Sequence, residues 1–297
     1  MPLTPGLYPD IPEEVYHSQT GEWADLPSKS RLEKLLWSPA HCRESWLHPK
    51  PPTDEMKFGS AVHSLVLTPK IFEAEYVIAG PCCAVTKKGT GCKNDGKYLH
   101  GGQWYCGTHK PDGEPDDKKS LSAEDFAKAT AMRDSIMAHP AAASLINSLD
   151  AVELSAIFLD PDADLLCKMR MDGVSHANEC IIDIKTTGDA RKGEFDRSIF
   201  DFGYHRQAAM YLHGAASIGQ KFNHFVIIAV EKTAPYAVGV YRLKDDIVEL
   251  GWLDVGQMMM TYRTCAEQNY WPAYSEKVED IGIPGWAIRK VTLAREG

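Results

Sequence analysis

Apolar residues follow two different periods along this chain, and they predict helices on either side of a block of strands. Helical spacing of Leu32, Leu35 and Leu36 after the capping residues Ser28 and Ser30 predicts a short helix that ends near Pro39. The same spacing predicts helices at 54–67, 123–138, 194–217 and 245–268, and a short alanine-rich helix after residue 140. Apolar runs bounded by turn formers predict strands at 152–159, 165–171, 180–186 and 224–231, with 236–243 as a hairpin partner. This order of elements is typical of the α/β class, with a mixed α+β sheet at the centre.

Charged residues stand where two of these strands end. Asp172 follows the first strand, and Asp183 and Lys185 close the second. Side chains two apart on a strand share a face, and a hairpin brings Asp172 beside the other two. Two facing carboxylates repel each other unless a cation lies between them, and hard oxygen ligands suit Mg²⁺ or Mn²⁺. The pattern therefore predicts metal-dependent phosphodiester hydrolysis, with the lysine orienting a water or neutralising charge on the phosphate. Solvated charges at a strand end are the alternative.

Four further side chains could complete such a site. Gln207 and Tyr211 are separated by one helical turn on the helix that follows, so both could reach back over the strand ends. The alternative is a helix surface with an amide and a half-buried tyrosine. His63 lies beside the apolar stripe of the 54–67 helix, either as a packed histidine or as a third metal ligand. Glu153 lies at the start of the strand predicted at 152–159, and it either lies near the metal or faces solvent.

Composition narrows the class of protein. The 297 residues can bury a full core, and no apolar stretch or N-terminal pattern indicates a membrane span or a signal peptide, so we expect a cytoplasmic location without a membrane partner. The net charge of −9 argues against a generally basic nucleic-acid coat but is compatible with a nuclease, whose basic groups need to line only one channel. Phosphate-binding glycine loops and the serine-hydrolase elbow are missing from the sequence.

Residues 81–110 break the pattern and read as an inserted module, which an acidic linker at 111–117 follows. Its candidate zinc ligands are Cys82, Cys92, Cys106 and His109. Cys83 competes with its neighbour for the first position. Four sulfur and nitrogen ligands that leave no coordination position open indicate a structural Zn²⁺ site. The alternative is a loop with free thiols and a free histidine. With five lysines and one aspartate, the module is locally basic, which indicates contact with a nucleic-acid backbone.

Several separated motifs together resemble a known family. They are GLYPDIPEEVYH, SKSRLEKLLWSPAH, FGSAVHSLVLTP, AVELSAIF, CKMRMDGV, IIDIKTTGDA and QAAMYL. In this order they are similar to the PD-(D/E)XK nuclease superfamily, and more narrowly to the exodeoxyribonuclease VIII-like branch of phage and prophage recombination exonucleases. Two features depart from the family: Met171 stands where the family name has proline, and the module at 81–110 is not part of the core pattern.

The resemblance implies one nuclease domain over 1–297 that acts as a Mg²⁺-dependent exonuclease on linear double-stranded DNA, 5′ to 3′. In that family the metal is held by residues that match Asp172, Asp183 and the Ile184 carbonyl, with His63 as a further ligand. Lys185 then positions the water, and residues 207 and 211 steer the scissile phosphate or that water. The resemblance also implies a ring-shaped homo-oligomer, a single-strand annealing recombinase as partner, and a bacterial host cell. A structure-specific endonuclease and a weakly catalytic DNA-binding recombination scaffold are the alternatives.

Overall fold

The computed structural model describes residues 3–113, 116, 118–286 and 288–289. A six-stranded sheet forms its centre, with the order β1-β6-β7-β8-β9-β10. The strands are β1 (Gly6–Tyr8), β6 (Ala151–Asp160), β7 (Leu165–Ser175), β8 (Cys180–Thr187), β9 (His224–Glu231) and β10 (Val238–Arg242). All neighbours pair antiparallel except β8 and β9, which pair parallel, so the predicted α/β class with a mixed sheet is confirmed.

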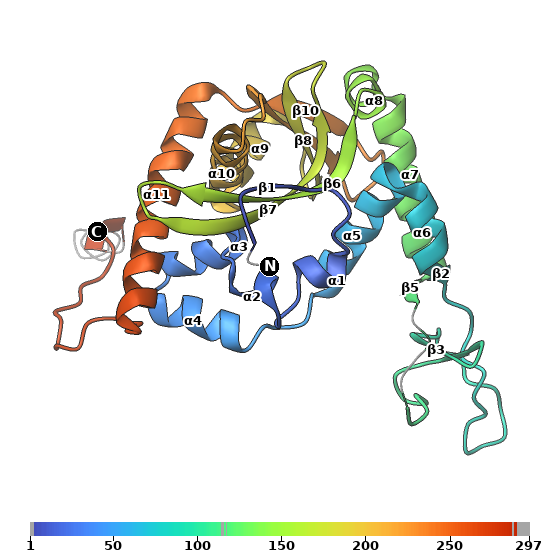
Figure 1. Cartoon of the computed structure of the whole chain (residues 1–297). Helices are drawn as coiled ribbons and strands as arrows, with labels where there is room; N and C mark the ends of the chain where they lie inside the picture. Colours follow the sequence, from blue (N-terminus) through green and yellow to red (C-terminus); the bar gives the residue numbers. More distant parts are fainter. Residues whose placement is uncertain (1–2, 114–115, 117, 287, 290–297) are drawn as a thin grey trace.

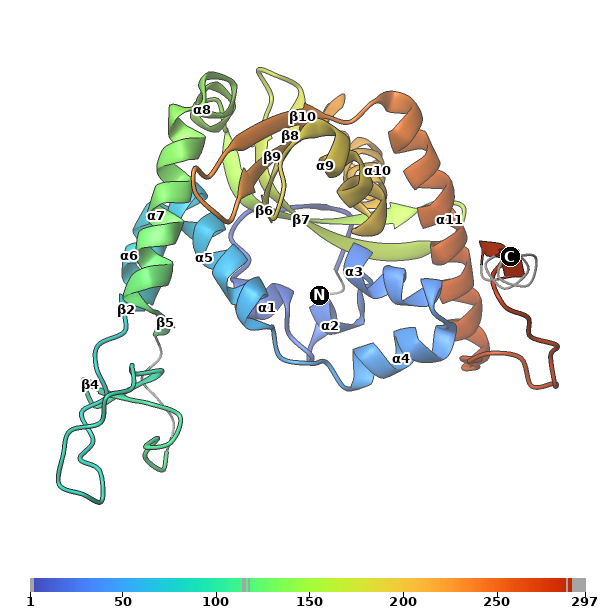
Figure 2. The same ribbon diagram turned by 180° about the vertical axis from the view of Figure 1, so that it is seen from behind.

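Helices cover both faces of this sheet (Figure 1). One face packs against α5 (Asp54–Leu67), α7 (Ala123–Ala138) and α8 (Pro140–Asn147). The other packs against α9 (Lys192–Asp201), α10 (Tyr204–Ser217) and α11 (Asp245–Gln268). Because β9 is covered on both sides, its residues read as one apolar run, whereas strands with a half-exposed face alternate. The N-terminal helices α1 (Glu13–Tyr16), α2 (Glu22–Asp25), α3 (Lys29–Leu32), η1 (Glu33–Leu36) and α4 (Pro39–Leu47) run below β7 (Figure 2).

The predicted element bounds hold for α5, α7 and α11 and need correction at three places. Strand β7, predicted to end at residue 171, continues to Ser175, so Asp172 lies within the strand and not after it. The helix expected over 194–217 is two helices, because Gly203 adopts φ +64° between them. A Cβ at this glycine would lie 1.9 Å from Oε1 of Glu33 and 2.5 Å from Nη2 of Arg206, so a larger residue would have to displace these side chains. Residues 6–8, for which no strand was predicted, form the edge strand β1 by pairing with Ser155–Ile157 of β6. No described helix is long and apolar enough to cross a membrane.

The segment 81–110 lies on an arm that projects away from the body of the molecule (Figures 1 and 2). It follows α6 (Pro69–Glu75) and β2 (Tyr76–Ile78), and the chain returns through β5 (Lys119–Leu121), which pairs with β2 in parallel. Within the arm, β3 (Tyr98–His100) and β4 (Gln103–Tyr105) form a hairpin, and Trp104 packs against Gly80 and Gly96 so closely that neither glycine could carry a Cβ. Of the acidic linker at 111–117, residues 114, 115 and 117 lie outside the described residues.

Candidate active site

The sheet opens into a fork where β7 and β8 separate. These strands pair only through Gly173–Ser175 and Cys180–Ile182. The next residues along the two strands are Asp172 and Asp183, which stand directly opposite each other. They are the first facing pair at which the two strands are no longer paired. Beyond this point β8 continues its pairing with β9 up to Thr187. The fork therefore brings two carboxylates together at a place where the backbone groups of β8 that face β7 are not used by a neighbouring strand.

Asp183 is the most buried group of this fork, with 1% of its surface exposed. Its Oδ1 accepts a hydrogen bond from Nε2 of Gln207 at 2.6 Å. Its Oδ2 lies 2.8 Å from Nζ of Lys185, as the spacing of two along the strand predicts. Burial raises the pKa of Asp183 although Lys185 acts against it. Burial disfavours the Lys185 ammonium, but the carboxylates of Asp183 and Asp172 outweigh it and raise the pKa of this lysine, which keeps it protonated.

Asp172 is bound from the opposite side of the sheet. Nδ1 of His63, on α5, lies 3.2 Å from its Oδ2, and the backbone N–H of Ile184 donates to the same oxygen at 3.0 Å. Burial opposes ionisation of Asp172, but His63 and Lys185 hold its pKa below the usual value. Burial likewise lowers the basicity of His63, and Asp172 more than compensates, so the histidine pKa is raised. Helices from both faces thus contribute side chains to the fork.

Glu153 extends the row of acids onto β6. The β6–β7 register puts it opposite Asp172, between the bridge pairs Val152–Gly173 and Leu154–Met171. Its backbone adopts φ +50°, an uncommon conformation for glutamate that interrupts the ladder at this position. Burial, and after it the Asp172 carboxylate, raise the pKa of Glu153 to about 7. The guanidinium of Arg170 lies 3.7 Å from its Oε2.

Tyr211 and Tyr204 flank the fork on α10. The Tyr211 ring is buried edge-on to Phe225, and burial, Tyr16 and the carboxylates of the fork raise the pKa of its phenol well above the usual value. It therefore lies close to the carboxylates without the direct hydrogen bond that Gln207 makes. Nζ of Lys185 sits 5.0 Å from the centre of the Tyr204 ring, within the range of a cation–π contact.

The fork fits a divalent cation by two observations. Oδ2 of Asp183 is buried and pairs with the Lys185 ammonium at 2.8 Å, and no other donor among the described residues reaches it. A carboxylate oxygen can accept more than one partner, so this oxygen keeps a lone pair for a cation. Because the N–H and C=O of one strand residue point to the same side, the Ile184 carbonyl faces the fork together with the N–H that reaches Asp172. Two carboxylates and a carbonyl form the oxygen-rich set that Mg²⁺ and Mn²⁺ bind.

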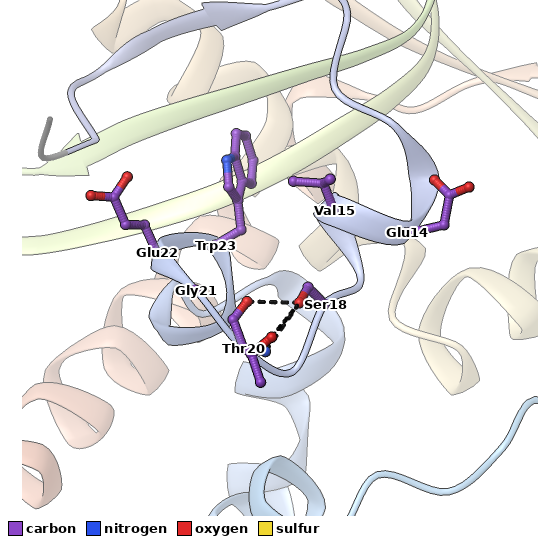
Figure 3. A pocket seen from close by; sticks show the side chains of 7 residues that line it. All are labelled: Glu14, Val15, Ser18, Thr20, Gly21, Glu22 and Trp23. Carbon is purple, nitrogen blue, oxygen red and sulfur yellow. Dashed lines mark hydrogen bonds between the residues drawn. The ribbon is translucent and has the colours of Figure 1, made fainter.

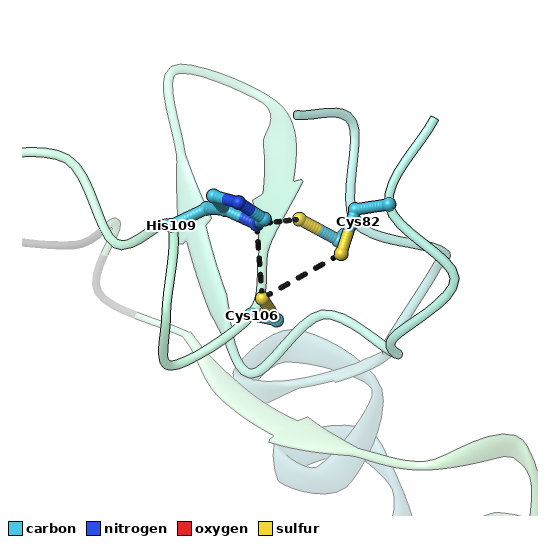
Figure 4. A group of neighbouring side chains, drawn as sticks. Cys82, Cys106 and His109 are labelled. Carbon is cyan, nitrogen blue, oxygen red and sulfur yellow. Dashed lines mark hydrogen bonds between the residues drawn. The ribbon is translucent and has the colours of Figure 1, made fainter. Parts of the chain in front are cut away.

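The arm carries a second candidate metal centre (Figure 4). The ligand atoms of Cys82, Cys92, Cys106 and His109 lie within 4.8 Å of one another. Sγ of Cys92 and Sγ of Cys106 are 3.9 Å apart, and Nδ1 of His109 lies 3.7 Å and 3.3 Å from Sγ of Cys82 and Cys106. A tetrahedral zinc with bonds of about 2.3 Å holds its sulfur ligands about 3.8 Å apart, so the spacing fits. Burial opposes ionisation of Cys106, but backbone N–H groups and Asn94 lower its pKa to about 6.

A surface pocket of about 250 Å³ lies between α1 and α2 (Figure 3). Glu14, Glu22 and Trp23 contribute to its lining, and it contains none of the predicted site residues. Two carboxylates at its edge make it unfavourable for a phosphate group. The fork is therefore a better candidate for the active site than this pocket.

The sequence interpretation missed Arg170 and Tyr204. Arg170 precedes Asp172 by two on the same strand, so the strand period could have identified it. Tyr204 has no such signal, because its position over Lys185 depends on the glycine break between α9 and α10. The structure brings together His63, Asp172, Asp183, Lys185 and Gln207 by direct contacts, with Glu153 and Tyr211 beside them.

Comparisons with known proteins bear on this geometry. A family model described as a PDDEXK-like domain of unknown function (DUF3799) matches residues 28–282. No curated protein sequence matches the chain. Among solved structures, a protein from Eubacterium rectale described as a putative exonuclease matches with a TM-score of 0.59 and 14% sequence identity, over 95% of this chain and 98% of its own. That likeness shows the fold. A second structure, SSO0001, is 14% identical over 44% of this chain and 67% of its own, and its TM-score of 0.26 is too low to indicate a shared fold.

Proposed function

The chain belongs to the PDDEXK-like family DUF3799, and so to the PD-(D/E)XK nuclease superfamily, and on this premise we propose that it is a metal-dependent exodeoxyribonuclease. It hydrolyses phosphodiester bonds of linear double-stranded DNA, from the 5′ end. The observation that carries this proposal is the fork itself. Asp172 and Asp183 stand opposite each other there, with the Lys185 ammonium 2.8 Å from the buried Oδ2 of Asp183.

In this proposal Asp172, Asp183 and the Ile184 carbonyl hold Mg²⁺ or Mn²⁺, with His63 as a further ligand. The bound cation supplies a water of lowered pKa and neutralises charge on the phosphate. The Lys185 ammonium, kept protonated by its carboxylate neighbours, donates to the attacking water or to a phosphate oxygen, where negative charge increases in the transition state.

Residues of α10 and β6 support these groups. Gln207 fixes Oδ1 of Asp183, so that Oδ2 stays turned toward Lys185 and the fork. From the same helix Gln207 and Tyr211 act on the orientation of the scissile phosphate or the water. In this proposal Glu153, which stands opposite Asp172 on β6, accepts a proton from the water or donates one to the leaving oxygen.

We assign the arm a structural Zn²⁺ held by the three cysteines and His109, because a short loop segment needs such a bond to order itself. The five lysines of residues 81–110 are all exposed, which favours contact with the DNA backbone. A ring-shaped homo-oligomer, a single-strand annealing recombinase as partner and a phage or prophage origin in the cytoplasm of a bacterial host complete the proposal. They rest on the resemblance alone.

The experiment measures nucleotide release from linear duplex DNA with and without added Mg²⁺, beside a covalently closed circle of the same sequence. Asp183→Asn removes one of the two facing carboxylate charges from the fork and keeps the shape of the side chain. Asp162→Asn is the matched control, because this residue is exposed in the turn between β6 and β7, at the end of both strands that is remote from the fork.

We expect release from linear DNA only, dependence on Mg²⁺, loss in Asp183→Asn and full activity in Asp162→Asn. Cleavage of the closed circle would favour an endonuclease of the same fold. DNA binding without any hydrolysis, unchanged in Asp183→Asn, would favour the recombination scaffold.

A further inference from the structure

Two exposed phenylalanines stand at the elbow between α9 and α10. Phe200 is 70% exposed and Phe202 is 61% exposed. Single exposed apolar side chains are common on protein surfaces and need no explanation. Here, however, two large rings lie within three residues, and the same elbow carries Tyr204, whose ring supports the ammonium of Lys185. Their position beside the fork is what makes them informative.

Tyr204 and Phe202 form a row of neighbouring rings that begins at Lys185. Nζ of Lys185 is 5.0 Å from the Tyr204 ring centre. The Tyr204 and Phe202 ring centres are 5.8 Å apart, with 30° between the ring planes. The two distances together put the centre of the Phe202 ring within about 11 Å of Nζ of Lys185. This length equals roughly three times the spacing of about 3.4 Å between stacked bases in one DNA strand. Phe200 in turn stacks on His205 at 5.7 Å and 6°. Each phenylalanine thus has one face against a neighbouring ring and the rest of its surface open to solvent.

The elbow that carries these rings is firmly held. Nζ of Lys29 donates to the Phe202 carbonyl at 3.0 Å. The N–H of Phe202 donates to the Ser198 carbonyl at 3.0 Å, and the N–H of Gly203 donates to the Phe200 carbonyl at 3.1 Å. An aromatic side chain on a fixed backbone loses little conformational entropy when it binds a ligand. The elbow is therefore built to present the two rings rather than to bury them.

We propose that Phe200 and Phe202 form a stacking platform for nucleobases at the unpaired end of the DNA substrate. This inference rests on the proposed nuclease function, since it takes the scissile phosphate to lie at Lys185. A phosphate attracted by that ammonium brings its attached bases within reach of the open faces of the two rings. Stacking on aromatic side chains is tolerant of base identity, because every base has a π-face. The platform would therefore hold the strand end without reading its sequence.

The test uses a duplex with a short 5′ overhang whose terminal base is 2-aminopurine, a fluorescent base that stacking quenches. Binding is measured on the full-length protein without added Mg²⁺, and hydrolysis is measured with it. Phe202→Ala and Phe200→Ala remove the rings, and Phe202→Trp restores one. Trp286→Ala is the control, because Trp286 is a comparably exposed aromatic residue, 65% exposed, on the C-terminal segment.

We expect each alanine variant to lose quenching and to bind the overhang about 5- to 150-fold more weakly. We also expect KM to rise more than kcat falls, while Phe202→Trp and Trp286→Ala behave as wild type. Quenching and KM unchanged in both alanine variants, with wild-type protein hydrolysing DNA, would overturn the platform and leave the proposed function intact. Conversion of an oligomer to a monomer by the alanine variants would also overturn it, because the rings would then pack between copies of the chain. Absence of hydrolysis by wild-type protein would instead refute the proposed function.

Discussion

Replacing Gln207 by leucine tests the arrangement of the fork most directly. Its Nε2 donates to Oδ1 of Asp183 at 2.6 Å, and the acceptor is only 1% exposed, so water cannot readily replace the lost donor. Leucine keeps most of the side-chain volume and removes the donor. The change therefore isolates one hydrogen bond to a buried carboxylate.

The size of the effect follows from this geometry. A hydrogen bond to a charged group contributes about 1.5–3 kcal/mol net, and each 1.36 kcal/mol corresponds to a factor of ten. We expect kcat/KM to fall by roughly ten- to 150-fold, with a higher Mg²⁺ concentration at half-maximal rate, because Asp183 would no longer be held in place and its pKa would rise further. Without Mg²⁺, the melting temperature should fall by roughly 3–9 °C.

The assay combines nucleotide release from linear duplex DNA over a Mg²⁺ titration with thermal unfolding in the absence of added Mg²⁺. Gln257→Leu is the matched control, because this glutamine is exposed on α11 and its side chain donates to Thr261 in the same helix. If Gln207→Leu keeps the wild-type Mg²⁺ dependence and a kcat/KM within about twofold of wild type, Gln207 does not position Asp183 and the reasoning is refuted. A lower melting temperature with unchanged Mg²⁺ dependence would reduce Gln207 to a structural role.

Three further predictions concern the arm, the sheet and the elbow. Cys106→Ser should lower the zinc content, measured by elemental analysis, below the one ion per chain expected of wild type. The arm should then be cleaved faster in limited proteolysis, while the melting temperature of the main body stays unchanged. Lys168→Met should lower the free energy of unfolding by about 2–4 kcal/mol, because the buried Lys168 Nζ donates to two backbone carbonyls of the N-terminal segment. Because burial lowers the Lys168 pKa to about 8, the unfolded chain binds more protons above that pH, so the stability advantage of wild type over this variant should grow from pH 8 to 10 in denaturant titrations. Gly203→Ala should destabilise more than Gly219→Ala, which shares a positive φ but has open space where the Cβ would lie, whereas at Gly203 it meets Glu33; equal melting temperatures would contradict the clash.

The local elements of this fold could be predicted from the sequence because each is governed by its own period. The apolar stripe of α5, the continuous run of β9 and the long amphipathic α11 depend on side chains within one or two turns, and their bounds agree with the structure. The carboxylates and the lysine of the fork could be identified for the same reason: the distance of two between Asp183 and Lys185 puts them together on any strand. The cluster of three cysteines and His109 on the arm also follows from local spacing on one short segment.

The tertiary structure decided where these elements meet. Nothing near Asp172 in the sequence shows that β7 and β8 stop pairing at that residue, or that Glu153 stands opposite it on β6 with a left-handed backbone. The space beside Gly203 is filled by Oε1 of Glu33, a residue 170 positions away in the chain. Strand register and side-chain collisions are contacts between distant parts of the chain, and their energies do not appear in any local pattern. The sequence by itself therefore determined which groups the proposed chemistry uses, and the packing of the sheet against its two helical layers determined that they face one another.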